Sequence, residues 1–162
     1  MGTLLTSENL LARIMDDLAR LPVPCVLAAG DRHDEVTATA PGHVEVVGFT
    51  DLAALAAACT MMICHGGFGS LTTAFAHALP TVVLPYNVDQ DFNADRVEQI
   101  GGRLVGWQRL GEGDLADAVA AVHDDPAYRV AARRLADDVA ALAPPAQAAA
   151  TLVTDLAAVS GP

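Results

Sequence analysis

Three consecutive residues, His65, Gly66 and Gly67, stand between a short apolar run and a segment of helical pattern, and their types suit anion binding. The glycines let the backbone come close to a ligand and adopt angles that other residues avoid. The helix that we expect to begin near Phe68 directs unpaired N–H groups and the positive end of its dipole at this turn. Side-chain hydrogen-bond donors are added by His65 and by Ser70 in the first helical turn. The sequence therefore predicts a phosphate site at His65, Gly66, Gly67, Gly69 and Ser70.

A second polar pair, Asp89 and Gln90, follows the next apolar run of the chain, Thr81 to Leu84. Because the carboxyl ends of parallel strands meet at one edge of a sheet, we expect this pair to lie beside His65. A carboxylate and an amide can bind sugar hydroxyls, although Asp89 could instead cap the helix that follows. A phosphate site next to a hydroxyl-binding pair suggests a pocket for a nucleotide sugar.

Each of these features also has a plainer interpretation, and other chemistries fit the residues less well. The glycines could serve only close packing, and Asp89 with Gln90 could be a solvated loop pair. The glycine-rich turn is not a P-loop, because the required lysine is missing, and no serine-hydrolase elbow surrounds Ser70. The histidines and cysteines do not pair at the spacing of metal ligands, so we expect no metal site.

The elements that would position these residues alternate between apolar runs and helical patterns. Strands are predicted at 23–29, 44–47, 61–64, 81–84 and 103–107, and helices at 8–20, 52–59, 91–100, 115–123, 127–142 and 146–159, with a further helix that opens between 68 and 70. We expect Ser7, Asp51 and Asp114 to cap three of the helices, and 31–42 to be a polar loop. This alternation predicts one α/β domain over residues 1–162, with a parallel sheet and helices on both faces.

Composition narrows the range of partners. The 162 residues are 52% hydrophobic, all nine basic residues are arginine, and the formal net charge is −11. We therefore expect no binding to nucleic acid or to anionic membranes, which attract basic surfaces. The three cysteines lie in apolar stretches and indicate reduced thiols. Without a signal peptide or a run of 18 apolar residues, the expected location is the cytoplasm.

The motifs of the central stretch together resemble a known family. HGGFGS, then A-L-P, an apolar run to Pro85 and DQDFNADRV resemble the donor-binding half of GT-B glycosyltransferases. The closest type uses UDP- or TDP-sugars to decorate antibiotics and other secondary metabolites. The resemblance implies a Rossmann-like fold that forms one half of a GT-B enzyme. It also implies inverting sugar transfer to the hydroxyl of a small acceptor, with no metal and no cofactor besides the nucleotide sugar.

Within that resemblance, single residues take roles or depart from the pattern. Phe49 stands where the family often has a tryptophan that stacks on the nucleotide base, although it could also belong to the core. Asn93 is expected to support the site by hydrogen bonding. Ser70 replaces the usual threonine and keeps its hydroxyl, Ala78 replaces the usual glycine, and Cys64 stands where a second histidine is common.

The resemblance also implies a missing acceptor-binding domain, which in the family precedes this half and carries the general base. We therefore assign no catalytic residue here. The acceptor would bind through that N-terminal domain or a partner chain, and uncovered apolar surface could lead to a homodimer. One alternative is a non-catalytic module that binds nucleotide sugars or activates a partner. Another is a GT-B relative with different chemistry, such as an epimerase, for which only Asp89 and Asp91 are at hand.

Overall fold

The fold is built on short parallel strands, as the computed structural model shows for residues 8–21, 23–86, 88–142 and 145–159. Strands β1 (Cys25–Ala28) and β2 (Val44–Val47) form one parallel pair. A second group, in the order β3-β4-β5, joins β3 (Met62–Cys64), β4 (Thr81–Val83) and β5 (Arg103–Leu104), all parallel. The predicted α/β architecture with parallel strands is confirmed. Among the described residues, hydrogen bonds divide these strands into two groups.

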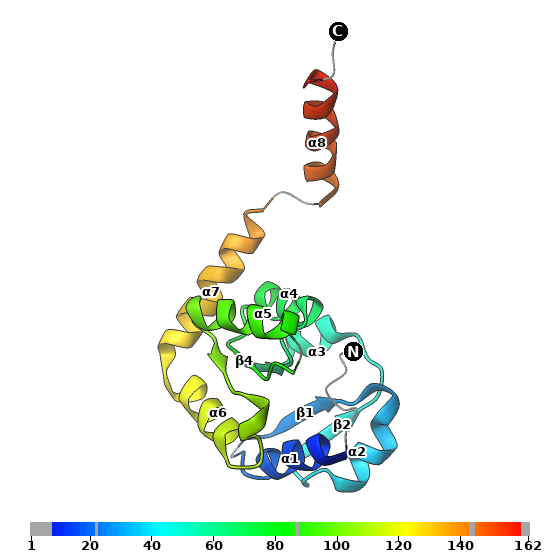
Figure 1. Cartoon of the computed structure of the whole chain (residues 1–162), viewed down its shortest axis with the longest axis vertical. Coiled ribbons are helices and arrows are strands. Elements are labelled where there is room, and N and C mark those ends of the chain that lie inside the picture. Colours follow the sequence, from blue (N-terminus) through cyan, green and yellow to red (C-terminus); the bar gives the residue numbers. More distant parts are fainter. Residues whose placement is uncertain (1–7, 22, 87, 143–144, 160–162) are drawn as a thin grey trace.

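Helices cover both faces of the strands (Figure 1). Figure 1 shows α1 and α2 on one side of the strands and α3, α4 and α5 on the other. The helix bounds are α1 Glu8–Leu18, α2 His33–Thr39, α3 Leu52–Ala57, α4 Phe68–Ala76, α5 Val88–Gln99, α6 Asp114–Asp124, α7 Pro126–Ala140 and α8 Pro145–Val159.

Strand β4 shows why both faces are apolar. Its neighbours Val82 and Val83 are both fully buried but point to opposite faces, since side chains alternate along a strand. Val82 belongs to the large core that includes the apolar stripe of α1, and Val83 to a smaller core with α4 and α5. A polar residue at either position would face a packed core, which explains the continuous apolar run in the sequence.

Two of the predicted helix starts have caps that the structure describes. The Asp51 carboxylate accepts a hydrogen bond from the Ala53 N–H at 2.9 Å and caps α3 as predicted. Asp125 caps α7 in the same way through the Ala127 N–H, with Pro126 in the first position of the helix. The predicted cap at Ser7 lies outside the described residues.

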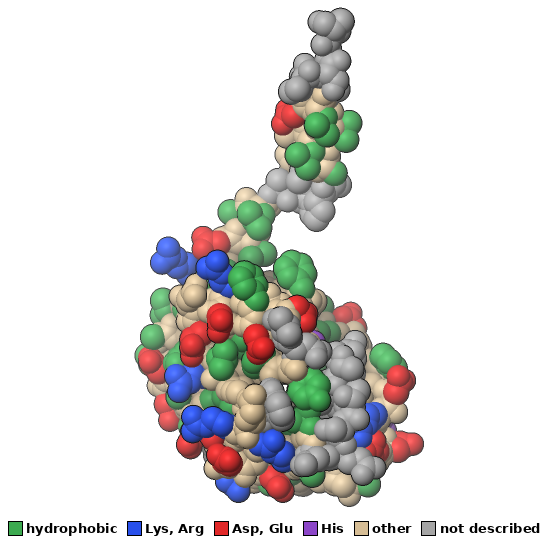
Figure 2. Space-filling view, viewed as in Figure 1, with side chains coloured by type: hydrophobic (Ala, Val, Ile, Leu, Met, Phe, Trp, Pro, Cys, Tyr) green, Lys and Arg blue, Asp and Glu red, His purple; other side chains and the backbone are tan. Residues whose placement is uncertain are grey.

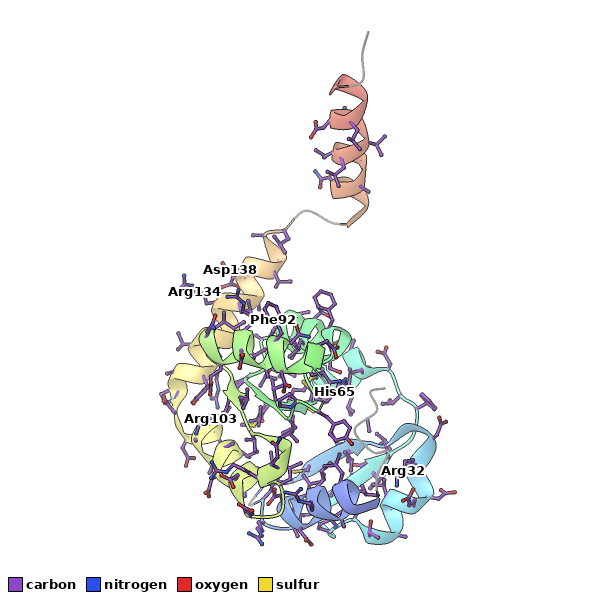
Figure 3. The ribbon with its side chains drawn as sticks, viewed as in Figure 1. Arg32, His65, Phe92, Arg103, Arg134 and Asp138 are labelled. Carbon is purple, nitrogen blue, oxygen red and sulfur yellow. The ribbon has the colours of Figure 1, made fainter. Side chains whose placement is uncertain are left out.

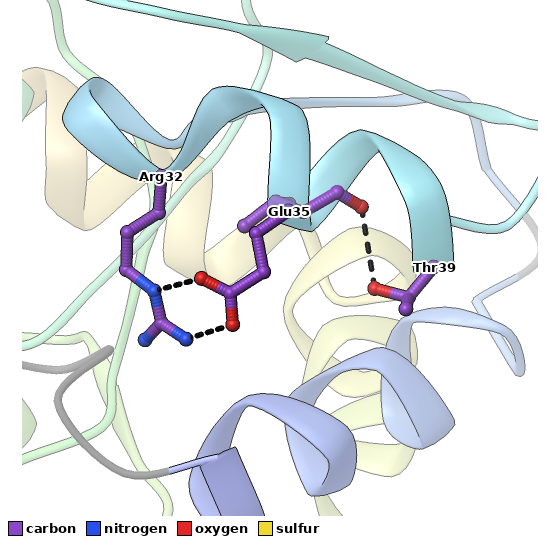
Figure 4. Close-up of polar contacts among 4 residues, drawn as sticks. Arg32, Glu35 and Thr39 are labelled. Atoms are coloured by element: carbon purple, nitrogen blue, oxygen red, sulfur yellow. Dashed lines mark hydrogen bonds and ion pairs between the residues drawn. The ribbon is translucent and has the colours of Figure 1, made fainter.

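The prediction of a polar loop at 31–42 is wrong. The short helix η2 (Gly30–Arg32) leads into α2, which contributes one buried side chain, Val36. Arg32 Nε donates to Glu35 Oε2 at 2.6 Å, and the Thr39 hydroxyl donates to the Val36 carbonyl (Figure 4). Because only one side chain in its two turns is apolar and buried, the sequence of this helix shows almost no hydrophobic periodicity.

Two further boundaries also differ from the sequence prediction. Asp114 is the first residue of α6, preceded by Gly113 at φ +100°, and it pairs with Arg109 at 2.6 Å instead of capping the helix. The strand predicted at 103–107 ends at Leu104, and the short helix η3 (Trp107–Arg109) follows.

The C-terminal part of the chain extends away from the body. In Figure 1, α7 follows α6 and runs upward past α5, and α8 projects beyond it. The side chains of Leu152, Val153 and Leu156 on α8 are 62% to 67% exposed, and the apolar group they form is visible in Figure 2. Within the part of the chain that the structure describes, no helix combines the length and apolarity needed to cross a membrane.

Candidate functional site

The candidate site is built where β3 and β4 end side by side. Cys64 pairs in register with Val83, and the Leu84 N–H donates to the Cys64 carbonyl at 2.8 Å. The loop to α4 therefore leaves the sheet next to the loop to α5. The predicted phosphate residues and the predicted sugar residues follow these two strand ends, so the structure brings them to one edge as expected.

Gly66 occupies a backbone conformation that needs glycine. Its φ is +86°, and a β-carbon at this position would lie 2.9 Å from Val83 Cγ1 and 3.4 Å from the Gln90 carbonyl oxygen. Both the positive φ and the lack of space exclude other side chains. The turn after β3 thus packs directly on the first turn of α5.

At position 67, glycine is required by the lack of space for a side chain and not by the backbone angles. Its φ and ψ of −65° and 141° are open to any residue, so the expectation of an unusual conformation holds only for Gly66. A β-carbon at Gly67 would instead lie 2.3 Å from His65 Nε2. The absence of a side chain at Gly67 makes room for the imidazole of His65.

His65 is half-buried and lies toward the middle of the molecule, whereas Phe92 lies on the outer side of α5 (Figure 3). Burial lowers the pKa of His65, and the negative charge of Asp89 acts in the opposite direction on this pKa. Both ring nitrogens lack a hydrogen-bond partner among the described residues. At neutral pH the ring is therefore mainly uncharged, with one N–H to donate and one nitrogen to accept.

The amino end of α4 has no side-chain cap. Gly67 precedes the helix and supplies no side-chain cap, so the first backbone N–H groups stay unsatisfied by a side chain. Ser70 lies in this first turn, and its hydroxyl makes no hydrogen bond to another described residue. By contrast, the Thr73 hydroxyl donates a hydrogen bond to the Gly69 carbonyl oxygen at 2.9 Å. A β-carbon at Gly69 would have nothing within 4 Å.

Asp89 and Gln90 lie in the first turn of α5, not in a loop as predicted. Asp89 is exposed, and acidic side chains in a first turn interact favourably with the helix dipole. Gln90 is only 6% exposed, and its Oε1 accepts a hydrogen bond from the Tyr86 N–H at 3.0 Å. The Gln90 side chain thus already holds the turn after β4, while Asp89 is open to solvent.

Asn93 connects the two halves of the site. Its Nδ2 donates to the carbonyl oxygen of Gly66 at 2.9 Å, across 27 positions of the sequence. Asn93 thus makes a hydrogen bond, as expected from the sequence, and its support of a binding site stays a prediction. The contact joins the second turn of α5 to the turn that carries His65.

Phe49 and Phe68 are two aromatic residues with exposed side chains. Phe49, in the loop after β2, is 75% exposed, so the alternative that it belongs to the core is excluded. Phe68, the first residue of α4, is 77% exposed, and sequence reasoning missed it as a candidate site residue. The available signal was an aromatic residue between two glycines, where packing against a core is hard to achieve.

Cys64, the last residue of β3, directly precedes His65. Burial raises the pKa of the Cys64 thiol to about 11, which keeps it protonated and unreactive at neutral pH. Among the described residues, His, Cys, Asp and Glu side chains do not gather in a group of three or more that could hold a metal ion.

Comparison with known proteins gives this arrangement a context. The chain is 38% identical over 114 residues to 3-alpha-mycarosylerythronolide B desosaminyl transferase of Saccharopolyspora erythraea, a match that covers 70% of this chain and 27% of that protein. The first curated relatives are matched over between 27% and 33% of their own length. The chain thus spans about a third of these relatives.

Solved structures agree with the fold. CalG4, the calicheamicin glycosyltransferase, superposes with a TM-score of 0.82 at 25% identity, over 99% of this chain and 43% of that one. The spinosyn rhamnosyltransferase SpnG in complex with thymidine diphosphate superposes with a TM-score of 0.81 at 27% identity, over 94% of this chain and 43% of that one. These neighbours place the chain in one part of the GT-B fold.

A match to a family model shows to which protein family the chain belongs. Residues 12–155 match the model described as "Erythromycin biosynthesis protein CIII-like, C-terminal domain". This match takes in every strand and the whole candidate site from His65 to Asn93. The chain belongs to the family of erythromycin biosynthesis protein CIII-like C-terminal domains.

Proposed function

We propose that this chain is the donor-binding half of a glycosyltransferase that moves a sugar from a UDP- or TDP-sugar to a hydroxyl of a small natural product. One observation carries the proposal: the open amino end of α4, His65 and Asp89 come together at the carboxyl edge of β3 and β4. The relatives named as sugar transferases, and the complex of SpnG with thymidine diphosphate, support the choice of ligand.

The proposed division of labour follows from the types of residue. The diphosphate would lie against Gly66, Gly67, Gly69 and Ser70, where the N–H groups at the start of α4 and the helix dipole stabilise the charge that develops on the leaving nucleotide. A ring N–H of His65 would donate to the same phosphates. Asp89 would bind a sugar hydroxyl, with Gln90 at its side, and so orient the anomeric carbon. Phe49 would stack on the base.

The reaction that we propose is inverting and needs no metal. In such a step the acceptor oxygen attacks the anomeric carbon from the face opposite the nucleotide, and the bond to the diphosphate oxygen breaks. The acceptor proton passes to a general base, which we place outside this chain. No cofactor besides the nucleotide sugar takes part in this scheme.

The donor-binding claim is tested by calorimetric titration of the chain with TDP and with UDP. We expect saturable binding that falls about tenfold or more in His65→Ala, equal to a loss of about 1.4 kcal/mol. His123→Ala is the matched control, because His123 is exposed on α6 away from the site, and its affinity should equal that of the wild type. Absence of binding to the folded wild-type chain would contradict the proposal.

We further propose that the acceptor half of the enzyme packs on α8. Leu152, Val153 and Leu156 recur on one side of this helix, and each described side chain of α8 is exposed. The relatives carry roughly two thirds of their length outside the matched region, which supplies enough chain to cover this stripe. A homodimer through the same stripe is the competing arrangement.

Sedimentation equilibrium of the chain, alone and mixed with a separately expressed acceptor half, distinguishes the two. We expect a complex with the acceptor half that is lost in the double variant Leu152→Ser, Leu156→Ser. A dimer of the chain alone that the same double variant abolishes would point to a second copy as the partner.

The non-catalytic alternative, a module that only binds nucleotide sugars or activates a partner, rests on the same site without an acceptor half. Sugar transfer by the complex of the two halves separates it from the enzyme. Transfer that disappears with His65→Ala would support the enzyme. Binding of TDP without transfer in that complex would favour the module.

A further inference from the structure

A hydrogen bond from Asn93 Nδ2 to the carbonyl oxygen of Gly66, 2.9 Å long, joins two elements that lie far apart in the sequence. Asn93 is half-buried. This hydrogen bond is not one of the backbone bonds that form β3 or α5. The bond spans two elements, the turn after β3 and the second turn of α5. A polar contact at such a place fixes the orientation of one peptide group.

That peptide group joins Gly66 to Gly67, so glycine flanks it on both sides. A trans peptide is planar, and its C=O and N–H point in opposite directions. Rotation of the whole plane changes ψ of Gly66 and φ of Gly67, and glycine tolerates both states more readily than any other residue. Without an external contact, this peptide has two accessible orientations.

The two orientations present opposite charges to the site. In the observed one, the carbonyl oxygen points at Asn93, and the Gly67 N–H on the other side makes no hydrogen bond to a described residue. In the rotated one, the carbonyl oxygen would take the place of this N–H and oppose an anion at the amino end of α4. Gly67 also lies directly against the ring of His65, so the rotation would disturb the neighbouring ring as well.

We infer that Asn93 is a positioning residue that holds the peptide between Gly66 and Gly67 in the orientation that favours a bound diphosphate. This inference rests on the proposed function for the identity of the ligand. Asn93 does not touch the diphosphate in this account and acts only through Gly66. Because Asn93 and the proposed sugar-binding residue Asp89 share α5, the same contact links the sugar side of the pocket to the phosphate side.

We call the hydrogen bond by which Asn93 holds the peptide between Gly66 and Gly67 the lock. Two substitutions distinguish the effect of this lock from the effect of side-chain packing at Asn93. Asn93→Ala removes the contact, and we expect TDP to bind about tenfold more weakly. Asn93→Asp keeps the shape but replaces the N–H donor with a carboxylate, which repels the Gly66 carbonyl and accepts from the rotated N–H. We expect Asn93→Asp to weaken TDP binding more than Asn93→Ala does, an order that loss of packing alone would reverse.

Val97→Ala is the matched control, because Val97 lies one turn further along α5 and is 3% exposed in the core. This variant should lower the melting temperature at least as much as Asn93→Ala does, while TDP affinity stays within about twofold of the wild type. An equal loss of affinity in Val97→Ala would overturn the inference, since general loosening of α5 would then explain the effect.

The orientation of the peptide is measured in the unliganded chain by the amide ¹⁵N and ¹H shifts of Gly67. We expect a large shift in Asn93→Asp and almost none in Val97→Ala. Unchanged Gly67 shifts in Asn93→Asp would overturn the lock even if TDP binds. A changed shift together with a wild type that fails to bind TDP would uphold the lock and contradict the proposed function instead.

Discussion

The imidazole of His65 lies so close to the α-carbon of Gly67 that a β-carbon there would be 2.3 Å from Nε2. The ring and the glycine therefore form one unit at the start of α4. Since the backbone angles of Gly67 suit any residue, only the contact with His65 restricts this position.

We predict that Gly67→Ala keeps the fold but displaces His65 and lowers TDP affinity about tenfold or more. The clash is with a ring held near the backbone, so the ring must move. A double-mutant cycle with His65→Ala tests the cause, because interaction energies of residues in contact are not additive. In the His65→Ala background, Gly67→Ala should cost little further affinity; full additivity of the two losses would disprove the contact as the cause.

Gly69→Ala should separate binding from stability. The position has open space around it in the free chain, and alanine in place of glycine inside a helix stabilises by about 0.5–1 kcal/mol. We expect a higher midpoint of urea unfolding together with weaker TDP binding, because the new methyl group occupies the space proposed for the diphosphate. If TDP affinity is unchanged in the more stable variant, the ligand does not approach α4 at Gly69.

The backbone at Ala78 is strained, and a substitution that relieves this strain should stabilise the chain. It has φ +52° after the end of α4, where the Leu79 N–H donates to the Ala74 carbonyl at 2.9 Å. This pattern favours glycine, and a left-handed alanine costs about 1–2 kcal/mol. Ala78→Gly should therefore raise the free energy of unfolding by about 1 kcal/mol.

The opposite sign is expected for the same exchange inside a helix. Ala121→Gly, at an exposed position of α6, should lower the free energy of unfolding by about 1 kcal/mol. Both values come from urea unfolding of the unliganded chain. A loss of stability in Ala78→Gly as large as that in Ala121→Gly would refute the strain at Ala78.

The pH dependence of binding should report His65. Burial lowers its pKa below the unfolded value of about 6.5, so the unfolded chain takes up the proton first and this residue's contribution to stability is lost as pH falls below about 6.5. A bound diphosphate would raise the pKa of His65. TDP binding should therefore take up a proton and strengthen relative to His65→Gln as pH falls from 7.5 to 6.

Calorimetry in buffers of different ionisation enthalpy measures this proton uptake. Because TDP itself titrates near pH 6, the comparison with His65→Gln isolates the protein's share. Equal proton uptake by the two proteins would show that His65 does not face the diphosphate.

Asp17 should carry much of the stability of the loop before α6. Its carboxylate is fully buried and accepts hydrogen bonds from the N–H groups of Gly111 at 2.8 Å and Gly113 at 3.0 Å. Asp17→Asn replaces one acceptor oxygen with a donor that faces an N–H. We expect a loss of about 2–3 kcal/mol in the free energy of unfolding. Asp16→Asn, its exposed neighbour, should change stability by less than about 0.5 kcal/mol.

The sequence predicted the centre of the fold well, because the signals there are local. The apolar run before His65 and the one before Pro85 are short and bounded by turn residues, so the strands and the shared edge could be inferred. The left-handed conformation of Gly66 likewise follows from two glycines at a strand-to-helix turn.

The remaining features depend on contacts between distant parts of the chain. Asp17 is 94 residues from Gly111, and no pattern in the sequence connects them. The reason for Gly67 is the position of a neighbouring ring, and α2 has only Val36 to mark its buried side. Gln90 could not be distinguished from an exposed loop residue, because its burial depends on where the turn at Tyr86 packs.

The proposed donor site is tested most directly by mapping TDP on the ¹⁵N-labelled chain through its amide chemical shifts. We expect the largest changes at Gly67, Gly69 and Ser70, with smaller ones at Asp89. The open groove of about 500 Å³ between the end of α5 and α7, lined by Ile100, Val130 and Arg134, should be unaffected. Saturable changes confined to that groove, with none at the amino end of α4, would contradict the proposed site.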